Sequence, residues 1–394
     1  MTTEHVHDVL VVGGGNGGLS AAAHLLRRGS KDVGLIEPAD RHVYKPLQHY
    51  VGTGLADFDE LARPQASLIP DGVAWHRTAA VSIDPVQRIV HCADGSKVRG
   101  RDILLAPGAR IDWDLLPGAE AALAEGTAIT TFVDGALGDA RTRLAGMTGG
   151  RAIFHVHDQP ASGQETAFKP LFIACDMWQS AGVLDRIHVV LAHEGARLHA
   201  VEAIEREIRR HLDDYGVDVR LATRIERIDG ADVTLTGPDG SGVERAELVA
   251  LHPPYAAPAM IADSGLDGPG TGGFVAIDPE TLRHRVHPRI WAVGDAADLG
   301  SGRTGGGLRQ QVKIAVENIR RARGGMPLQR YDGYTVAPIA TARRSLSFGE
   351  YDRALRVRRS LPVPDQIRST PVWHLLDRYA LPQAYWHRIL RGKL

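Results

Sequence analysis

Three observations predict an α/β fold with two Rossmann-like units followed by a helical C-terminal tail. A glycine-rich turn follows an apolar strand near the start of the chain, a second strand-turn-helix pattern begins near residue 150, and the last residues are aromatic and basic at helical spacing. We expect a discontinuous first unit at residues 1–112 and 270–345, a second unit at 113–269, and the tail at 346–394.

The first unit opens with HDVLVVGGGNGGLSAAAHLL at residues 7–26. Its first part predicts an apolar strand, its last part has helical spacing, and the glycines between them fit G-x-G-x-x-G. Such glycines permit a tight turn, close approach of the backbone to a pyrophosphate and close packing of helix on strand, with the helix N-terminus facing the negative charge. The residues expected at this dinucleotide site are Gly13, Gly15, Asn16 and Gly18.

A second short strand, VGLIEP, ends in Glu37. This acid follows the last of those glycines by about twenty residues, the position from which a carboxylate binds a ribose hydroxyl. A glycine-rich turn that binds nothing would need neither the helix nor the acid, so the three features together favour a dinucleotide.

The composition is ordinary for a globular protein of two or three domains: 394 residues, of which 43% are hydrophobic and 24% charged. No basic-then-apolar leader precedes the first strand and no apolar run reaches bilayer length, so we expect a cytoplasmic protein. Cys92 and Cys175 are too few for a disulfide framework, and no Cys or Cys/His spacing predicts a metal site. We also expect no nucleic-acid partner.

Two further patterns continue the α/β reading. Residues 75–110 alternate short strands with turns, which predicts an antiparallel excursion that carries Val81 and returns to the sheet at ILLAPGA. The second unit is predicted from RAIFHVH, a helix around residues 167–180 and the strand RIHVVLA. Its turn contains Gly163 alone, so the glycines that would seat a second dinucleotide are missing. The expected cofactor contacts here are Val81, Ala106, Pro107 and Gly108.

HPRIWAVGDAADLG predicts a strand at residues 290–293 that stops at Gly294 and Asp295, followed by glycines and a helix from about residue 308 to 323. A carboxylate at a strand end suits a ribityl hydroxyl. A helix N-terminus beside it stabilises negative charge on a reduced flavin ring. These features predict FAD as the cofactor.

In this order the motifs resemble the flavoproteins with two dinucleotide-type domains, and more narrowly the sulfide:quinone oxidoreductases. The narrower resemblance is carried by HVYKPLQHYVGTG, by LHPPY at 251–255 and by RYDGYTVAPIATARRSLSFGEYD at 330–352. It implies an FAD-dependent oxidoreductase that passes electrons from a small reductant to a quinone. It also places Lys45 beside the flavin, where its charge neutralises phosphate or the flavin.

The resemblance fails at the cysteine pair through which sulfide-oxidising members work. Ala337 stands at one position, and two alignments of DQPASGQETAFKPL place Gln159 or Gly163 at the other. Because a persulfide relay needs two thiols, we expect none here. The same alignments put Glu165 or Lys169 where a proton-handling group lies near the flavin, and these two are our catalytic candidates.

The tail reads TPVWHLLDRYALPQAYWHRILRGKL. Residues 341–394 hold 11 Lys or Arg against 4 Asp or Glu, so this stretch carries +7 and the rest of the chain −8. Basic residues interleaved with aromatics at helical spacing suit an anionic membrane surface, which predicts a membrane-docking tail and a peripheral place on the inner face of the cell membrane. The alternatives are helices packed on the protein's own core and a homodimer seam.

Two functions therefore stay open. The first is the quinone-linked flavoenzyme just described. The second is a soluble flavoprotein that oxidises a specialised metabolite, with Glu165 or a histidine as the base.

Overall fold

The computed structural model describes residues 6–158, 166–360 and 365–394. Its first sheet has the strand order β5-β2-β1-β8-β7-β6, and β19 pairs with the second half of β8. The pairings among β5, β2, β1, β8 and β19 are parallel, whereas β6, β7 and β8 form an antiparallel meander. The strands are β1 (Val6–Val12), β2 (Val33–Ile36), β5 (Val73–His76), β6 (Ala80–Asp84), β7 (Ile89–Cys92), β8 (Lys97–Leu105) and β19 (Ile290–Ala292).

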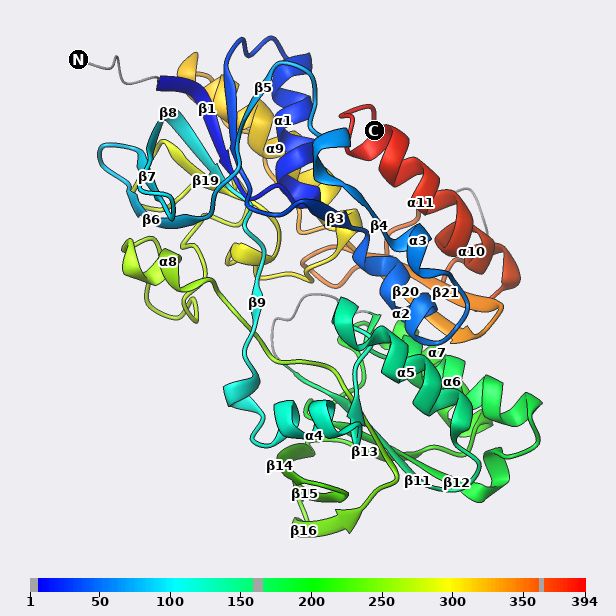
Figure 1. Cartoon of the computed structure of the whole chain (residues 1–394). Helices are drawn as coiled ribbons and strands as arrows, with labels where there is room; N and C mark the ends of the chain where they lie inside the picture. The colour runs from blue at the N-terminus through cyan, green and yellow to red at the C-terminus, as the bar shows by residue number, and fades with distance from the viewer. Residues whose placement is uncertain (1–5, 159–165, 361–364) are drawn as a thin grey trace.

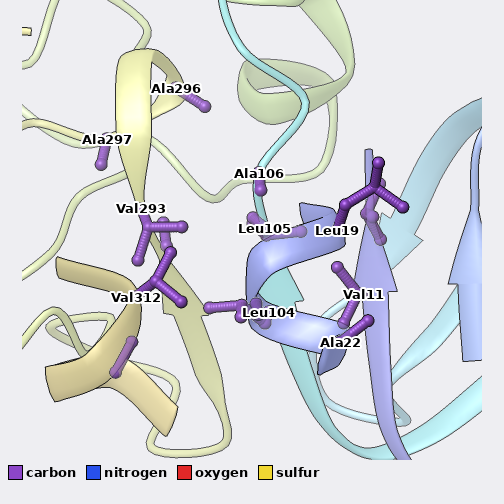
Figure 2. Packing of buried hydrophobic residues seen from close by; sticks show 14 of the residues in the cluster. Val11, Leu19, Ala22, Leu104, Leu105, Ala106, Val293, Ala296, Ala297 and Val312 are labelled. Carbon is purple, nitrogen blue, oxygen red and sulfur yellow. The ribbon is translucent and has the colours of Figure 1, made fainter. Parts of the chain in front are cut away.

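Helices α1 (Asn16–Arg27) and α9 (Gly305–Arg323) pack beside this sheet and against each other. Figure 2 shows how small side chains on α1 and the strand ends, such as Ala22 and Ala106, interlock with Val11, Leu105 and Val312. Small residues at the contact let the helix approach the strands closely. The expected strand at residues 290–293 and helix near 308–323 are therefore present, with the helix beginning three residues earlier.

The second unit is a parallel sheet in the order β10-β17-β11-β12-β13 and lies below the first unit in Figure 1. The pair β9 (Arg110–Ile111) and β18 (Tyr255–Ala256) joins the chain segments that run between the units. An antiparallel sheet of β14, β15 and β16 extends the second unit. Its elements are α4 (Ala119–Glu125), β10 (Ala128–Ile129), α5 (Leu137–Gly146), β11 (Gly150–Val156), α6 (Lys169–Ser180), β12 (Ile187–His193), α7 (Glu202–Asp214), β13 (Asp218–Arg220), β14 (Arg224–Asp229), β15 (Asp232–Gly237), β16 (Gly240–Arg245) and β17 (Leu248–Leu251).

Short elements surround the carboxyl ends of the first sheet. The pair β3 and β4 and helices α2 and α3 lie next to the tail, and α8 lies beside β6 (Figure 1). Their bounds are β3 (Arg41–Val43), α2 (Gln48–Gly52), α3 (Phe58–Leu61), β4 (Ala62–Pro64) and α8 (Ala259–Asp263).

The hairpin of β20 (Thr335–Ala342) and β21 (Ser345–Tyr351) corrects the predicted start of the tail. A boundary between residues 345 and 346 would cut this hairpin, whose strands are held together by their hydrogen bonds. The helical part begins at α10 (Pro371–Leu375) and continues through a π-helical turn (Leu376–Ala380), α11 (Leu381–Ala384) and a second π-helical turn (Tyr385–Ile389). We call residues 371–389 the tail helices.

The tail helices turn most of their aromatic face inward, contrary to the prediction that this face meets a membrane. Trp373, Tyr385 and Trp386 are at most 6% exposed and belong to the core of the first unit. The physical reason is that other rings of the protein cover them. Tyr385 and Trp386 contact Tyr44, which directly follows β3, and Trp373 stacks on Phe348 of β21. None of the described helices combines the length and the apolarity needed to cross a bilayer.

Candidate functional site

The predicted glycine turn lies between β1 and α1, and the structure gives its glycines different tasks. A Cβ on Gly13 would lie 2.4 Å from the carbonyl oxygen of Ala106, and one on Gly18 would lie 1.7 Å from the carbonyl oxygen of Gly13. Gly13 also has a φ of +99°, which disfavours any side chain. A Cβ on Gly15 would meet no protein atom within 4 Å. Gly13 and Gly18 therefore allow the turn to close, whereas Gly15 leaves open space at the N-terminus of α1.

Glu37 follows β2 and faces the same turn. Its carboxylate accepts hydrogen bonds from the backbone nitrogens of Gly14 and Ala39, the latter at 2.7 Å. The side chain of Gln65 also reaches the turn and donates to the carbonyl oxygen of Gly14 at 2.9 Å. The acid is thus fixed next to the glycines, where a ribose would follow a bound pyrophosphate.

The second predicted cofactor segment meets the first at the carboxyl ends of β8 and β19. Ala106 donates its backbone N–H to Val12 at 2.8 Å, and Gly294, at a φ of +72°, donates to the side chain of Gln311 on α9 at 2.9 Å. A Cβ on Gly305, the first residue of α9, would lie 3.7 Å from the side chain of Asn16, the first residue of α1. Two helix N-termini therefore adjoin.

This geometry suits a large anionic cofactor. Each N-terminus carries unpaired N–H groups and about half a positive charge. Pro107 and Gly108 continue from Ala106 at the end of β8, and a Cβ on Gly108 would meet open space. Asp295 follows Gly294 with a carboxylate at the strand end, as the sequence predicts for ribityl recognition.

The two remaining predicted cofactor contacts, Lys45 and Val81, lie on a 3₁₀ turn and in β6. Lys45 is exposed at the start of a single 3₁₀ turn (Lys45–Leu47) that leads into α2. Val81 lies at a bulge in β6, a strand that β7 and β8 separate from β1, and its side chain is 51% exposed. The side chain of Val81 is therefore half-exposed at a bulge, and its contact with the cofactor stays a prediction.

The structure describes only one of the two catalytic candidates, Lys169. Glu165, with Gln159 and Gly163, lies outside the described residues. Lys169 is fully buried at the start of α6, where its ammonium donates to Asp377 Oδ2 of the tail helices at 2.6 Å. The same carboxylate oxygen accepts from Tyr50 Oη at 2.7 Å, and the Lys169 ammonium lies 5.1 Å from the Tyr50 ring centroid. Sequence reasoning missed this network.

The cysteines are placed as inert side chains. Cys92 is buried in the core of the first unit and Cys175 in the core of the second. Burial raises the pKa of both thiols, which disfavours the reactive thiolate. Ala337, which stands at one of the two cysteine positions, is also fully buried. A Cβ on Gly349 would lie 3.5 Å from the Cβ of Ala337.

A cluster of polar side chains stands where β11 and β12 end. His155 Nε2 lies 3.1 Å from Glu194 Oε1, and His157 Nδ1 lies 2.8 Å from Glu194 Oε2. Burial lowers the pKa of His155, whereas both imidazoles hold the pKa of the Glu194 carboxyl well below its usual range despite its own partial burial. The sequence search missed this cluster because it looked for Cys-containing spacings. The usable signal was His-x-His at the end of one apolar strand and Glu at the end of the next.

A cavity of about 690 Å³ opens between the units. The second unit lines it with Asp158 and His193, and the facing wall includes Tyr255, Phe274 and Arg303. Arg303 is buried over the ring of Phe274, with 3.8 Å between the guanidinium carbon and the ring centroid. The cavity has the size of a small-molecule site, about 300–1,000 Å³.

Comparisons with known proteins agree with this geometry. The model of the pyridine nucleotide-disulphide oxidoreductase family matches residues 7–150. The mitochondrial sulfide:quinone oxidoreductase of Dictyostelium discoideum is 26% identical over 399 residues, which cover 99% of this chain and 87% of that protein. The sulfide:quinone oxidoreductase structure from Aquifex aeolicus aligns with a TM-score of 0.82 at 17% identity, over 98% of this chain and 91% of that one. A chain of the Tetrahymena thermophila mitochondrial ATP synthase has the same fold, with a TM-score of 0.84, 16% identity and coverage of 100% and 98%.

Proposed function

We propose that this chain is an FAD-dependent oxidoreductase of the pyridine nucleotide-disulphide oxidoreductase superfamily and that it passes electrons from a small reductant to a quinone. The proposal is supported by the family match over residues 7–150 and by the similarity to sulfide:quinone oxidoreductases over nearly the whole chain. The observation that carries the proposal is the pair of adjoining helix N-termini, with open space at Gly15, at the carboxyl ends of β1, β8 and β19.

The proposal assigns FAD to residues on both helices. The α1 N-terminus and Gly15 hold the pyrophosphate, Glu37 the ribose, and Asp295 the ribityl chain. When bound, the flavin accepts an electron pair from a donor and gives it to an acceptor. The N-terminus of α9 stabilises the negative charge of the reduced ring. These roles follow from helix direction and the placement of each carboxylate.

Electron entry in this proposal uses no cysteine pair. The chain contains only Cys92 and Cys175, both are buried, and they lie in different cores. A donor would enter through the cavity between the units, and a flavin held at the two helix N-termini would supply the redox chemistry without a thiol relay. The turn after β11 contains Gly163 as its only glycine, and Asp158 at the edge of the second sheet opposes a phosphate by like charge, which disfavours NADH as the donor.

The proposal also includes a membrane contact, by a face other than the one first predicted. Val372, Leu375 and Tyr379 are 65%, 57% and 54% exposed and repeat at helical spacing along the outside of the tail helices. Exposed Arg388 and Lys393 lie farther along the same segment. An apolar stripe followed by basic residues suits the surface of an anionic bilayer, where quinones are dissolved.

The central test is reoxidation of the reduced flavin. FAD-loaded protein is reduced anaerobically with dithionite and mixed with a short-chain quinone in a stopped-flow instrument. We expect rapid recovery of the oxidised flavin spectrum. If the reduced protein ignores quinones, the quinone-linked function is wrong, and oxidation of a specialised metabolite becomes the better interpretation.

The membrane contact needs point substitutions, because deleting the tail would uncover the core beneath Trp373 and Trp386. We expect replacement of the stripe (Val372→Ser with Leu375→Ser and Tyr379→Ser) to abolish flotation with anionic liposomes. Val86→Ser, at a side chain 74% exposed on another part of the surface, is the matched control and should float like the unmodified protein. Equal flotation of both variants would contradict the docking face.

A further inference from the structure

The cluster at the ends of β11 and β12 brings together three side chains that bind transition metals. His155, His157 and Glu194 each offer one ligand atom, and these atoms all lie within 4.8 Å of one another. The two measured contacts, 3.1 Å and 2.8 Å, are near the separation of about 3.3 Å between neighbouring ligand atoms around tetrahedral zinc. A small outward shift of the side chains would admit an ion.

The cluster also has unsatisfied bonding capacity. The side chains of His155 and His157 are 0% and 7% exposed. Among the described residues, the ring nitrogens that face away from Glu194, His155 Nδ1 and His157 Nε2, are buried without a hydrogen-bond partner. The Glu194 carboxylate is 18% exposed. Among the described residues it pairs with these two imidazoles, and it forms no ion pair with a lysine or arginine. With neutral imidazoles the cluster carries a net negative charge, which a divalent cation offsets.

The position in the fold is also that of a ligand site. Open parallel sheets bind ligands in the crevice at the carboxyl ends of their strands. The chain neighbours of the three ligands, which are Val156, Asp158 and His193, line the cavity between the units. Because successive side chains of a strand point to opposite faces of the sheet, the cluster lies one residue away from the cavity lining, on the other face of the same sheet edge.

We propose that His155, His157 and Glu194 form a zinc site with two imidazole ligands and one carboxylate ligand. Three protein ligands leave a fourth coordination position for water or a small anion. The site is independent of the quinone-linked function, because its evidence comes from the second unit alone.

The test uses the full-length, FAD-loaded protein without a polyhistidine tag, stripped with a chelator and titrated with ZnCl₂ by calorimetry. Metal analysis after gel filtration gives the stoichiometry, and X-ray absorption at the zinc edge gives the ligands. His157→Gln and Glu194→Gln each remove one ligand. His188→Gln is the matched control, since this residue is half-exposed on the same strand β12 but outside the cluster.

We expect one zinc per chain in the unmodified protein and in His188→Gln, a spectrum with two imidazoles, and affinity at least about tenfold weaker in both cluster variants. Flavin content and circular dichroism report whether the variants fold. If a variant does not fold, the stoichiometry and the X-ray absorption spectrum of the unmodified protein decide. No retained zinc, a spectrum without two imidazoles, or equal affinity in folded cluster variants and the control would overturn the site.

Discussion

Removal of the Asp377 carboxylate should strongly destabilise the protein. Asp377 is 4% exposed and Lys169 is fully buried, and a single carboxylate oxygen accepts from both Lys169 Nζ at 2.6 Å and Tyr50 Oη at 2.7 Å. Asp377→Ala leaves a buried ammonium without its counter-charge, which costs about 3–5 kcal/mol, and a buried hydroxyl without its acceptor, which costs about 1–3 kcal/mol. We therefore expect a loss of at least about 4 kcal/mol in the free energy of unfolding.

The assay is urea unfolding followed by circular dichroism and flavin fluorescence. Glu202→Gln is the control, because its pair with Arg206 is 3.1 Å long but both side chains are more than 70% exposed, and its loss should cost about 0.3–0.5 kcal/mol. Replacing the whole network by apolar groups (Tyr50→Phe with Lys169→Met and Asp377→Leu) should restore most of the stability, because no buried polar group is then left unpaired.

The comparison of these variants decides between two explanations. If Asp377→Ala loses no more than Glu202→Gln, the buried pair does not hold the tail helices in solution. If the apolar triple variant is as unstable as Asp377→Ala, the loss comes from packing, and the argument from an unpaired charge is wrong.

Three further predictions concern the cofactor, the donor and acid stability. Gly15→Val should fold yet lose stoichiometric FAD, because a Cβ at this position meets no protein atom and the added side chain fills the space expected for the pyrophosphate. Gly18→Ala should instead lose about 1–3 kcal/mol or more of stability. Absorbance and urea unfolding measure the two effects, and a yellow, FAD-saturated Gly15→Val would remove this loop from the site. NADH and NADPH should reduce the flavin slowly in anaerobic stopped flow, because the turn after β11 lacks the glycines of a dinucleotide site and Asp158 repels a phosphate. Sulfide should also be slow without a thiol pair. Rapid reduction by either class of donor contradicts the corresponding inference. Burial opposes ionisation of the Glu207 carboxyl, but its hydrogen bonds with His211, Arg210 and the backbone of residue 369 prevail and lower its pKa from 4.5 to about 2. The ionised carboxylate therefore stabilises the folded protein fully above pH 4.5, and this stabilisation is lost as the pH falls toward 2. The stability of Glu207→Gln should depend less on pH across that window, and unfolding curves with the same pH dependence as the unmodified protein would exclude this role.

The cofactor turn was predictable because its determinants are local. Gly18 and Glu37 act on the backbone of Gly13 and Gly14 within one strand-turn-helix-strand pattern, whereas Gly13 itself also makes room for the distant backbone of Ala106. Val81 lies in β6, which two strands separate from β1 in the sheet, and its role as a cofactor contact stays a prediction.

The orientation of the tail helices was not predictable in the same way. Helical spacing shows that a segment has an aromatic face, but not whether a membrane, a second chain or the protein's own core covers it. The answer depends on contacts such as that of Tyr385 with His42, which are 343 residues apart. The pairing of Lys169 with Asp377 spans 208 residues, so neither residue alone indicates a buried ion pair.

The buried ion pair of Lys169 with Asp377 can form only after the tail helices have left the ribosome. Residues 1–158 and α6 emerge early, but Lys169 has no carboxylate to neutralise it until Asp377 leaves the exit tunnel. Until then the nascent chain exposes the surface of β3 and Tyr44 that Tyr385 and Trp386 later cover, together with an ammonium group that stays in water. Chaperones and proteases recognise such surfaces, so a ribosome that stalls before the tail helices should produce a chain that is degraded even though both of its sheets have formed.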